Sequence, residues 1–393
     1  MSRPSLSWWF VVAIVLYACN LRMPITAVGP VIPLMQQDLH LSASTLGLLL
    51  TLPLLAFALV SPLAPKLHQR MGLQTALALG LVLIILGFVL RFVFGNMGLF
   101  AGTLLLGVGI SLGNVLLPSL IKQYFGQHIA LMTSVYAFTM GVAAATGSMS
   151  VLPISQWLHG NWSLALLVLI VFPIVSLLLW LPYCRKSAKP AHPTASKQQA
   201  IKPIWKHALA WQVTAFMGIN SMIYYSIITW LPSILQHAAY TPLQAGQIHG
   251  YLQLAGALPG FLLVPLIKRC ADQRLPACLV SSLMFLGLLG LMLWPQWAIV
   301  WAVCIGFGSG GTILLGLMFM GLRTHTPFQA ASLSAMAQSI GYLLAAITPP
   351  LFGWWQQQQQ HWHGVLLTLC VAAILVFISA FGCGRQIKIP NDV

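Results

Sequence analysis

The chain of 393 residues is 59% hydrophobic and only 5% charged, whereas a soluble globular domain carries about 25% charged residues. This composition excludes an ordinary soluble protein. The net charge of +15 arises from 18 Lys and Arg against three acidic residues. Because these bases are dispersed through apolar sequence, we attribute them to the positive-inside rule of membrane proteins, and we expect no nucleic-acid partner.

A helix needs about 20 apolar residues to cross the hydrocarbon core of a bilayer. On that length scale the sequence predicts an all-α membrane protein with twelve transmembrane helices. The predicted spans cover residues 8–34, 43–64, 73–94, 98–121, 129–152, 162–183, 208–236, 243–267, 275–294, 298–321, 330–352 and 364–383. Pro and Gly inside these spans do not exclude helices, because neighbouring helices satisfy the freed backbone groups.

The basic residues segregate to one side of these spans. Sixteen of the 18 Lys and Arg fall in loops on one face, the opposite loops contain none, and the two exceptions lie within spans. This asymmetry predicts a multi-pass protein of the bacterial inner membrane with both termini in the cytoplasm. Residues 184–207 carry six bases and three prolines. We expect them to form a linker between six-helix bundles at 1–183 and 208–393.

The two halves of the sequence match each other at a shift of 199 residues, which aligns span 1 with span 7, 2 with 8 and 4 with 10. The matched pairs include Pro33 and Pro232, Gln37 and Gln236, Gly47 and Gly246, Gly107 and Gly306, and Gly109 and Gly308. Such a repeat predicts a duplicated unit and therefore two pseudo-symmetric six-helix bundles.

Arg22 lies within the first predicted span. It follows Trp8 by 14 residues, which places it about 21 Å along the helix, where a charge costs about 3 kcal/mol or more. The three carboxylates, Asp38, Asp272 and Asp392, all lie outside the predicted spans. We therefore interpret Arg22 as an anchor for an anion or for a pair of nitro or carboxyl oxygens. The alternative is a structural arginine that donates to helix carbonyls, amides and water.

Two other ionisable side chains fall within predicted spans. Arg91 is close to the outer end of span 3, and we expect its side chain to extend to the lipid headgroups. His249 lies in span 8, and in the absence of an intramembrane carboxylate it is the candidate proton carrier. A neutral, hydrogen-bonded histidine is the alternative.

Uncharged polar residues and tyrosines complete the candidate site. Asn220 with Tyr224, and Gln338 with Tyr342, stand four residues apart and so present polar helix faces. The predicted substrate-binding residues are Arg22, Asn20, Asn114, Tyr136, Asn220, Tyr224, Tyr225, His249, Gln253, Gln338 and Tyr342. For any single member, interhelical hydrogen bonding is the alternative role.

Other motifs do not indicate chemistry. The seven cysteines contain no Cys-x-x-Cys pair, and we interpret them as small hydrophobic residues. We expect no metal site, no catalytic residue and no cofactor. The segment GFGSGG at 306–311 lacks the Gly-Lys-Ser ending of a phosphate-binding loop, which favours close helix packing instead.

Twelve spans in two similar halves around a basic loop resemble the major facilitator superfamily, whose halves rock around a site near the bilayer midplane. The loop after span 2, PKLHQRMG, keeps Leu67, Arg70 and Gly72 of that superfamily's G-x-L-x-D-R-x-G loop. It departs from the pattern at Pro65 and Gln69, which replace the first Gly and the Asp.

Longer segments resemble the cyanate and 2-nitroimidazole transporter branch, and they look closer to the 2-nitroimidazole members. These segments include NLRMPITAVGP at 20–30, LGNVLLPSLIK at 112–122 and GINSMIYYSIITWLP at 218–232. The resemblance implies a monomeric secondary transporter that moves a small polar or anionic solute by alternating access, with or without protons. The expected solutes are cyanate-like, nitroimidazole-like or small heteroaromatic acids.

Three other functions fit the sequence less well. A proton-coupled pump that exports drugs or nitroaromatics shares the fold, but most such pumps rely on an intramembrane carboxylate. A membrane-bound enzyme would need paired acids, a metal cluster or an activated nucleophile, and the sequence shows none of these. A sensor or scaffold would normally add a soluble domain, for which the predicted spans leave no room.

Overall fold

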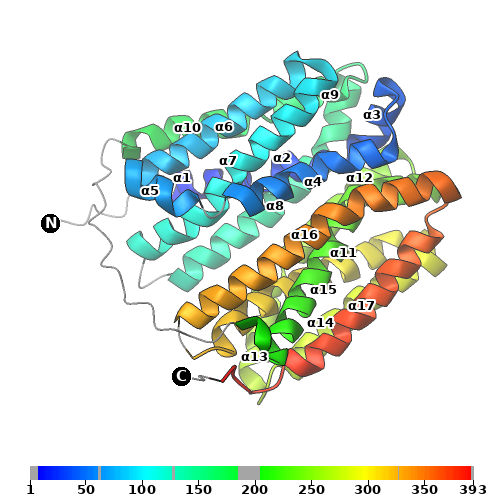
Figure 1. Ribbon diagram of the computed structural model, residues 1–393. Coiled ribbons are helices and arrows are strands. Elements are labelled where there is room, and N and C mark those ends of the chain that lie inside the picture. Colours follow the sequence, from blue (N-terminus) through cyan, green and yellow to red (C-terminus); the bar gives the residue numbers. More distant parts are fainter. Residues whose placement is uncertain (1–7, 61–62, 126–128, 185–203, 326, 391–393) are drawn as a thin grey trace. The chain divides into compact units, whose positions relative to one another are not determined.

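The computed structural model describes residues 8–60, 63–125, 129–184, 204–325 and 327–390 (Figure 1). Within these ranges the regular structure is helical and contains no strand, so the all-α prediction is confirmed. The chain divides into two compact units: unit 1 comprises Met1–Leu41 and Leu52–His192, and unit 2 comprises Ser42–Thr51 and Pro193–Val393.

Within each half of the chain, the described helices follow one another with short connections. In the first half of the chain they are α1 (Trp8–Cys19), α2 (Met23–Thr26), η1 (Gly29–Val31), α3 (Ile32–Leu39), α4 (Ala43–Val60), α5 (Ala64–Met71), α6 (Leu73–Val93), α7 (Gly95–Tyr124), α8 (Ile129–Trp157), α9 (Trp162–Val168) and α10 (Val171–Cys184). In the second half they are η3 (Ile204–Lys206), α11 (Ala208–His237), α12 (Pro242–Ala257), α13 (Pro259–Arg269), α14 (Arg274–Leu293), η4 (Pro295–Trp297), α15 (Ala298–Leu322), α16 (Pro327–Gln359) and α17 (His363–Cys383).

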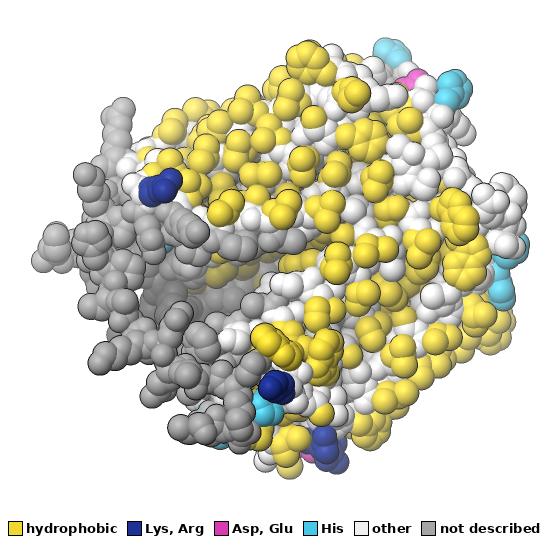
Figure 2. Space-filling model, viewed as in Figure 1, with side chains coloured by type: hydrophobic (Ala, Val, Ile, Leu, Met, Phe, Trp, Pro, Cys, Tyr) yellow, Lys and Arg dark blue, Asp and Glu magenta, His cyan; other side chains and the backbone are white. Residues whose placement is uncertain are grey.

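Ten helical segments among the described residues are long and apolar enough to cross a membrane, and each coincides with a predicted span. The other two predicted spans correspond to α4, whose apolar part Ala43–Phe57 is shorter, and to α11. Helix α11 has 30 residues, but polar residues such as Gln212 and Asn220 lower its hydropathy. Large apolar side chains such as Leu178 remain 63% exposed, and Figure 2 shows hydrophobic side chains over much of the face in view. Such an apolar surface suits contact with lipid.

The same kind of glycine contact occurs inside each unit. A Cβ on Gly109 of α7 would meet the carbonyl of Gly80 on α6, and a Cβ on Gly308 of α15 would meet the carbonyl of Val280 on α14. In each unit a glycine therefore lets two neighbouring helices approach to backbone contact. The repeated contact is what a duplicated six-helix unit predicts.

The first predicted span is not one continuous helix. Its residues form α1, a turn at 20–22, the short α2, η1 and α3. Pro24 and Pro30 have no backbone N–H, so they remove helical donors to the carbonyls of Asn20 and Thr26. The amide of Asn20 bonds to the Tyr17 carbonyl at 3.0 Å rather than to the carbonyl four residues back. The prolines are visible in the sequence. The position of the break, however, depends on which side chains donate to the backbone carbonyls that lose their helical hydrogen bonds.

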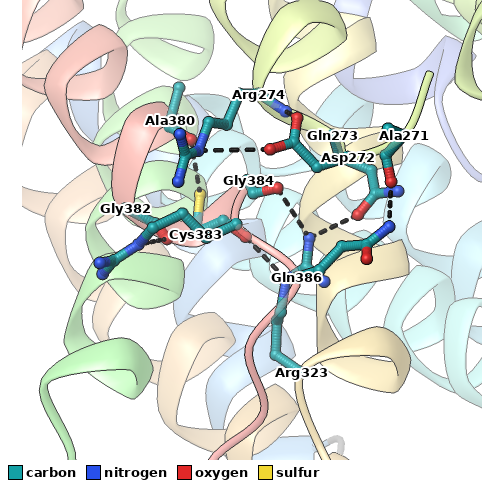
Figure 3. A network of polar contacts seen from close by, with 11 residues as sticks. Ala271, Asp272, Gln273, Arg274, Arg323, Ala380, Gly382, Cys383, Gly384 and Gln386 are labelled. Atoms are coloured by element: carbon teal, nitrogen blue, oxygen red, sulfur yellow. Dashed lines mark hydrogen bonds and ion pairs between the residues drawn. The ribbon is translucent and has the colours of Figure 1, made fainter.

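Arg323, which we counted as a loop base, is buried at the end of α15 with only 3% of its surface exposed. Its Nε donates to the Cys383 carbonyl at 2.7 Å, and its Nη2 donates to the Gly384 carbonyl at 3.2 Å and to Gln273 Oε1 at 2.5 Å (Figure 3). The two carbonyls lie at the end of α17, where helical donors are lacking. Arg323 therefore ties the end of α17 to the start of α14.

Arg323→Met should lower the melting temperature of the detergent-purified protein by several degrees. The substitution leaves the Cys383 carbonyl without its donor, at a cost of about 1–3 kcal/mol. The Gly384 carbonyl keeps the amide of Gln273 as a donor. Arg274→Met is the matched control, because Arg274 pairs with Asp272 at 3.4 Å with a side chain that is 46% exposed, and such pairs contribute about 1 kcal/mol or less. Equal melting temperatures for the two variants would contradict a structural role for Arg323.

Candidate functional site

Arg22 occupies the turn that separates α1 from α2. It immediately precedes α2, with φ −126° and ψ −43°, and its carbonyl accepts hydrogen bonds from the amides of Ile25 and Thr26 at 3.1 Å. The side chain is half-buried. The structure thus places a half-buried arginine at a break in a membrane-spanning segment. Transporters often form binding sites at such discontinuous helices.

Arg91 on α6 has a different environment, and our expectation that it extends to the headgroups is wrong. It is 7% exposed, and it donates from Nε to Thr103 Oγ1 at 2.8 Å and from Nη1 to the Pro24 carbonyl at 3.3 Å. The amide of Val28 bonds to the Ile25 carbonyl, so the Pro24 carbonyl lacks its regular helical donor. Arg91 supplies that donor and thereby stabilises the break after Arg22.

Asn20 also bonds to groups at the break. Its Nδ2 donates to the Leu16 carbonyl and to Ser176 Oγ on α10, both at 2.8 Å. Ser148 of α8 donates to the Thr26 carbonyl at 3.2 Å, which compensates for the missing N–H of Pro30. The structure therefore places Asn20 among the residues that hold the broken helix, while Arg22 is held at the turn itself.

Two other predicted site residues of unit 1 lie on neighbouring helices. Tyr136 of α8 donates to Asn114 Oδ1 of α7 at 3.5 Å, and both side chains are half-buried. Gly113, next to Asn114, lies against Tyr17 and Leu21, so that a Cβ there would collide with both side chains. This contact brings the Asn114 region of α7 to the turn that holds Arg22. Unit 1 thus combines a guanidinium, an amide and a phenol.

In unit 2 the predicted residues form a second polar group on α11 and α12. Tyr224 donates to Gln253 Oε1 at 2.7 Å, and Asn220 Nδ2 donates to the Ser309 carbonyl of α15 at 3.4 Å. His249 is fully buried and lies near the Ile228 carbonyl, but neither ring nitrogen has a hydrogen-bond partner among the described residues. The sequence indicated this group except for Ser309, which carried no distinguishing signal.

The remaining predicted residues are half-buried. The rings of Tyr225 and Tyr224 pack edge to face with centroids 5.4 Å apart. Gln338 donates to Ser334 Oγ at 2.7 Å within α16, one turn before Tyr342. These contacts orient the side chains and are compatible with either a binding or a packing role.

The two described carboxylates have other partners. Asp38 accepts from the indole N–H of Trp162 at 3.0 Å, and Asp272 pairs with Arg274 at 3.4 Å. No group of three or more metal-ligating side chains occurs in the part of the chain that the structure describes. The polar chemistry of the described spans therefore consists of guanidinium, amide, hydroxyl and imidazole groups.

Comparison with known proteins assigns the chain to a family. Residues 10–349 match the Major Facilitator Superfamily. The chain belongs to this superfamily. It is 44% identical to the 2-nitroimidazole transporter of Escherichia coli, over 96% of each chain. It is 26% identical to the cyanate transport protein of the same organism, over 94% of this chain and 96% of that protein. The chain is thus more similar to the 2-nitroimidazole transporter than to the cyanate transport protein.

A solved structure shows the same fold. A bacterial homologue of human drug peptide transporters superposes with a TM-score of 0.72 at 13% identity, over 95% of this chain and 97% of that one. Together with the family match, this similarity confirms the predicted major facilitator fold. The protein is a multi-pass membrane transporter of a small solute and not an enzyme.

Proposed function

We propose that the transporter moves a small, flat, electron-rich solute, of which 2-nitroimidazole is the leading example, by alternating access, and that Arg22 binds the electron-rich group. The observation that supports this proposal is the contrast between the two intramembrane arginines. Arg91 is buried on α6, whereas Arg22 is half-buried at a helix break. An ionisable residue kept accessible inside a membrane protein usually serves the transported species.

The chemistry of arginine fits this class of solute. A guanidinium presents two parallel N–H donors in a plane, which match the paired oxygens of a nitro or carboxylate group. Cyanate would engage the same donors as a compact anion. Asn114 and Tyr136 supply further hydrogen-bonding groups from α7 and α8. Coupling to protons through His249 remains a prediction from the sequence.

A thermal-shift screen tests the proposed solute class. The purified protein is mixed with 2-nitroimidazole, cyanate and small heteroaromatic acids, with imidazole as the matched compound that lacks the nitro group. A ligand at 100 times its dissociation constant stabilises a protein by about 2.7 kcal/mol. We expect stabilisation by 2-nitroimidazole and none by imidazole at the same concentration. If 2-nitroimidazole and imidazole raise the melting temperature equally, the nitro group does not contribute to binding, and the proposed role of the electron-rich group is wrong.

We further propose that both termini lie in the cytoplasm of an inner-membrane protein, from the segregation of basic residues to one set of loops. The structure places His207 just before α11 and His237 at its end. A reporter fused after His207 should therefore be cytoplasmic, and one fused after His237 should be periplasmic. Two fusions that report one compartment would overturn this orientation.

A further inference from the structure

Three tryptophans surround a hollow at one end of α14 and α15 in unit 2. The hollow has a volume of about 390 Å³ and is lined by Trp294, Trp297, Val300 and Trp301. Trp294 is 52% exposed and Trp297 is 62% exposed. We call this place the tryptophan hollow. None of the residues proposed to bind the solute lines it, so its role is a separate question.

Specific contacts hold the tryptophan hollow in shape. The indole N–H of Trp301 donates to the Trp294 carbonyl at 2.8 Å, and the amide of Trp297 donates to the same carbonyl at 3.2 Å. A Cβ on Gly290 would collide with the ring of Trp301, so the glycine lets α14 pack directly against this ring. These contacts fix Trp301 relative to Trp294 and Trp297, and the hollow is therefore a built feature of the fold.

The position of the tryptophan hollow along α14 and α15 corresponds to the level of the lipid headgroups. Helix α14 has 20 residues, so it is about 30 Å long and matches the thickness of the hydrocarbon core. Arg274 and Arg323 mark the opposite end of this helix pair. Tryptophan is enriched at the boundary between hydrocarbon and headgroups. Leu293 and Ile299, which are close to the tryptophans in sequence, are 48% and 52% exposed and extend the apolar surface that suits lipid.

The charges near the tryptophan hollow select the class of lipid. Residues 275–322 contain no Lys, Arg, Asp or Glu. The Tyr240 hydroxyl donates to the Pro295 carbonyl at 2.9 Å and so brings the loop after α11 close to the hollow, but residues 238–248 are also free of these charges. An anionic headgroup would therefore find no basic partner there. An indole ring attracts an ammonium group to its face, so the complement is a headgroup that contains an ammonium.

We propose that the tryptophan hollow binds the headgroup of one zwitterionic phospholipid, with the ammonium against the indole rings and the acyl chains along the apolar side chains of unit 2. Phosphatidylethanolamine and phosphatidylcholine have such a headgroup, whereas phosphatidylglycerol has a phosphate and no ammonium. The proposal does not depend on the identity of the solute, because the hollow lies within unit 2 and apart from the residues proposed to bind the solute.

Native mass spectrometry of the full-length, detergent-purified protein tests this site. The protein is mixed with equal amounts of phosphatidylethanolamine and phosphatidylglycerol that carry the same acyl chains, and the bound lipid is identified by its mass. We expect the wild type to retain phosphatidylethanolamine about fivefold more often than phosphatidylglycerol, because only the former offers an ammonium to the indole rings.

Trp297→Leu should reduce this ratio to within about twofold, because leucine keeps an apolar side chain but provides no ring for the ammonium. Trp354→Leu is the matched control, because Trp354 of α16 is 53% exposed and does not line the tryptophan hollow. That control should keep the fivefold ratio.

Three results would overturn the proposal: equal retention of the two lipids by the wild type, an unchanged ratio in Trp297→Leu, or an equal loss of the ratio in Trp354→Leu. If Trp297→Leu is not recovered as a monodisperse protein, Trp294→Leu takes its place, because Trp294 lines the same hollow and is also more than half exposed. The same expected and contradicting ratios then apply to Trp294→Leu.

Discussion

Arg22→Gln should weaken binding of 2-nitroimidazole by about 100-fold while the protein remains folded, because a charge-assisted pair of hydrogen bonds contributes about 1.5–3 kcal/mol. Arg22→Lys should weaken binding by about tenfold, since lysine keeps the charge but loses the planar pair of donors. Affinity and melting temperature are measured on the same preparations. Wild-type affinity in a destabilised Arg22→Gln protein would reassign Arg22 to a structural role.

Arg91→Gln is the control for this experiment. Arg91 lies within the same unit but bonds to Thr103 and to the Pro24 carbonyl. Its loss should lower the melting temperature, because it leaves a buried carbonyl without a donor. Any loss of affinity should follow from that destabilisation. We therefore expect opposite results for the two variants. Arg22→Gln should lower the affinity for 2-nitroimidazole, whereas Arg91→Gln should lower the melting temperature.

Gly310→Val should prevent recovery of folded protein. A Cβ at Gly310 would collide with the Gly256 backbone, and a backbone cannot move aside as a flexible side chain does. Overpacking of this kind costs about 3 kcal/mol or more. Gly321→Val is the control on the same helix, because a Cβ there meets nothing within 4 Å. Size-exclusion chromatography from detergent extracts should show a monodisperse peak for Gly321→Val only.

The Gly310 result would also bear on the segment at 306–311. We predicted close helix packing there rather than phosphate binding, and the contacts of Gly306 and Gly310 with α12 confirm the packing. The same contacts hold Ser309 beside Asn220. A recovered and folded Gly310→Val protein would mean that α12 and α15 tolerate a wider separation than the structure shows.

The helices could be predicted from the sequence because they depend on the mean hydropathy of long segments rather than on single contacts. Apolar length located the helices, and the repeat at a shift of 199 residues indicated two similar units. Hydropathy alone does not identify every membrane-spanning helix. Helix α11 is continuous over Ala208–His237, but Asn220 and its polar neighbours lower the mean hydropathy of the segment.

The candidate site was less predictable because it depends on individual contacts. Distance from the end of a span suggested that Arg91 extends to headgroups, yet the carbonyl released near Pro24 gives it an internal partner. Asn20 stays a predicted substrate-binding residue, and the sequence did not indicate its bond to the Leu16 carbonyl released by the break. In both cases prolines were visible in the sequence, whereas the partners from other helices, Arg91 on α6 and Ser176 on α10, were not.

Solute exchange in proteoliposomes tests whether the protein transports 2-nitroimidazole and whether that transport requires Arg22. Vesicles that contain the purified protein and are loaded with unlabelled 2-nitroimidazole are placed in labelled 2-nitroimidazole, with wild type and Arg22→Gln compared at equal protein content. We expect saturable accumulation of label by the wild type and none by Arg22→Gln. Accumulation no greater than that of empty vesicles, or equal accumulation by both proteins, would contradict the account.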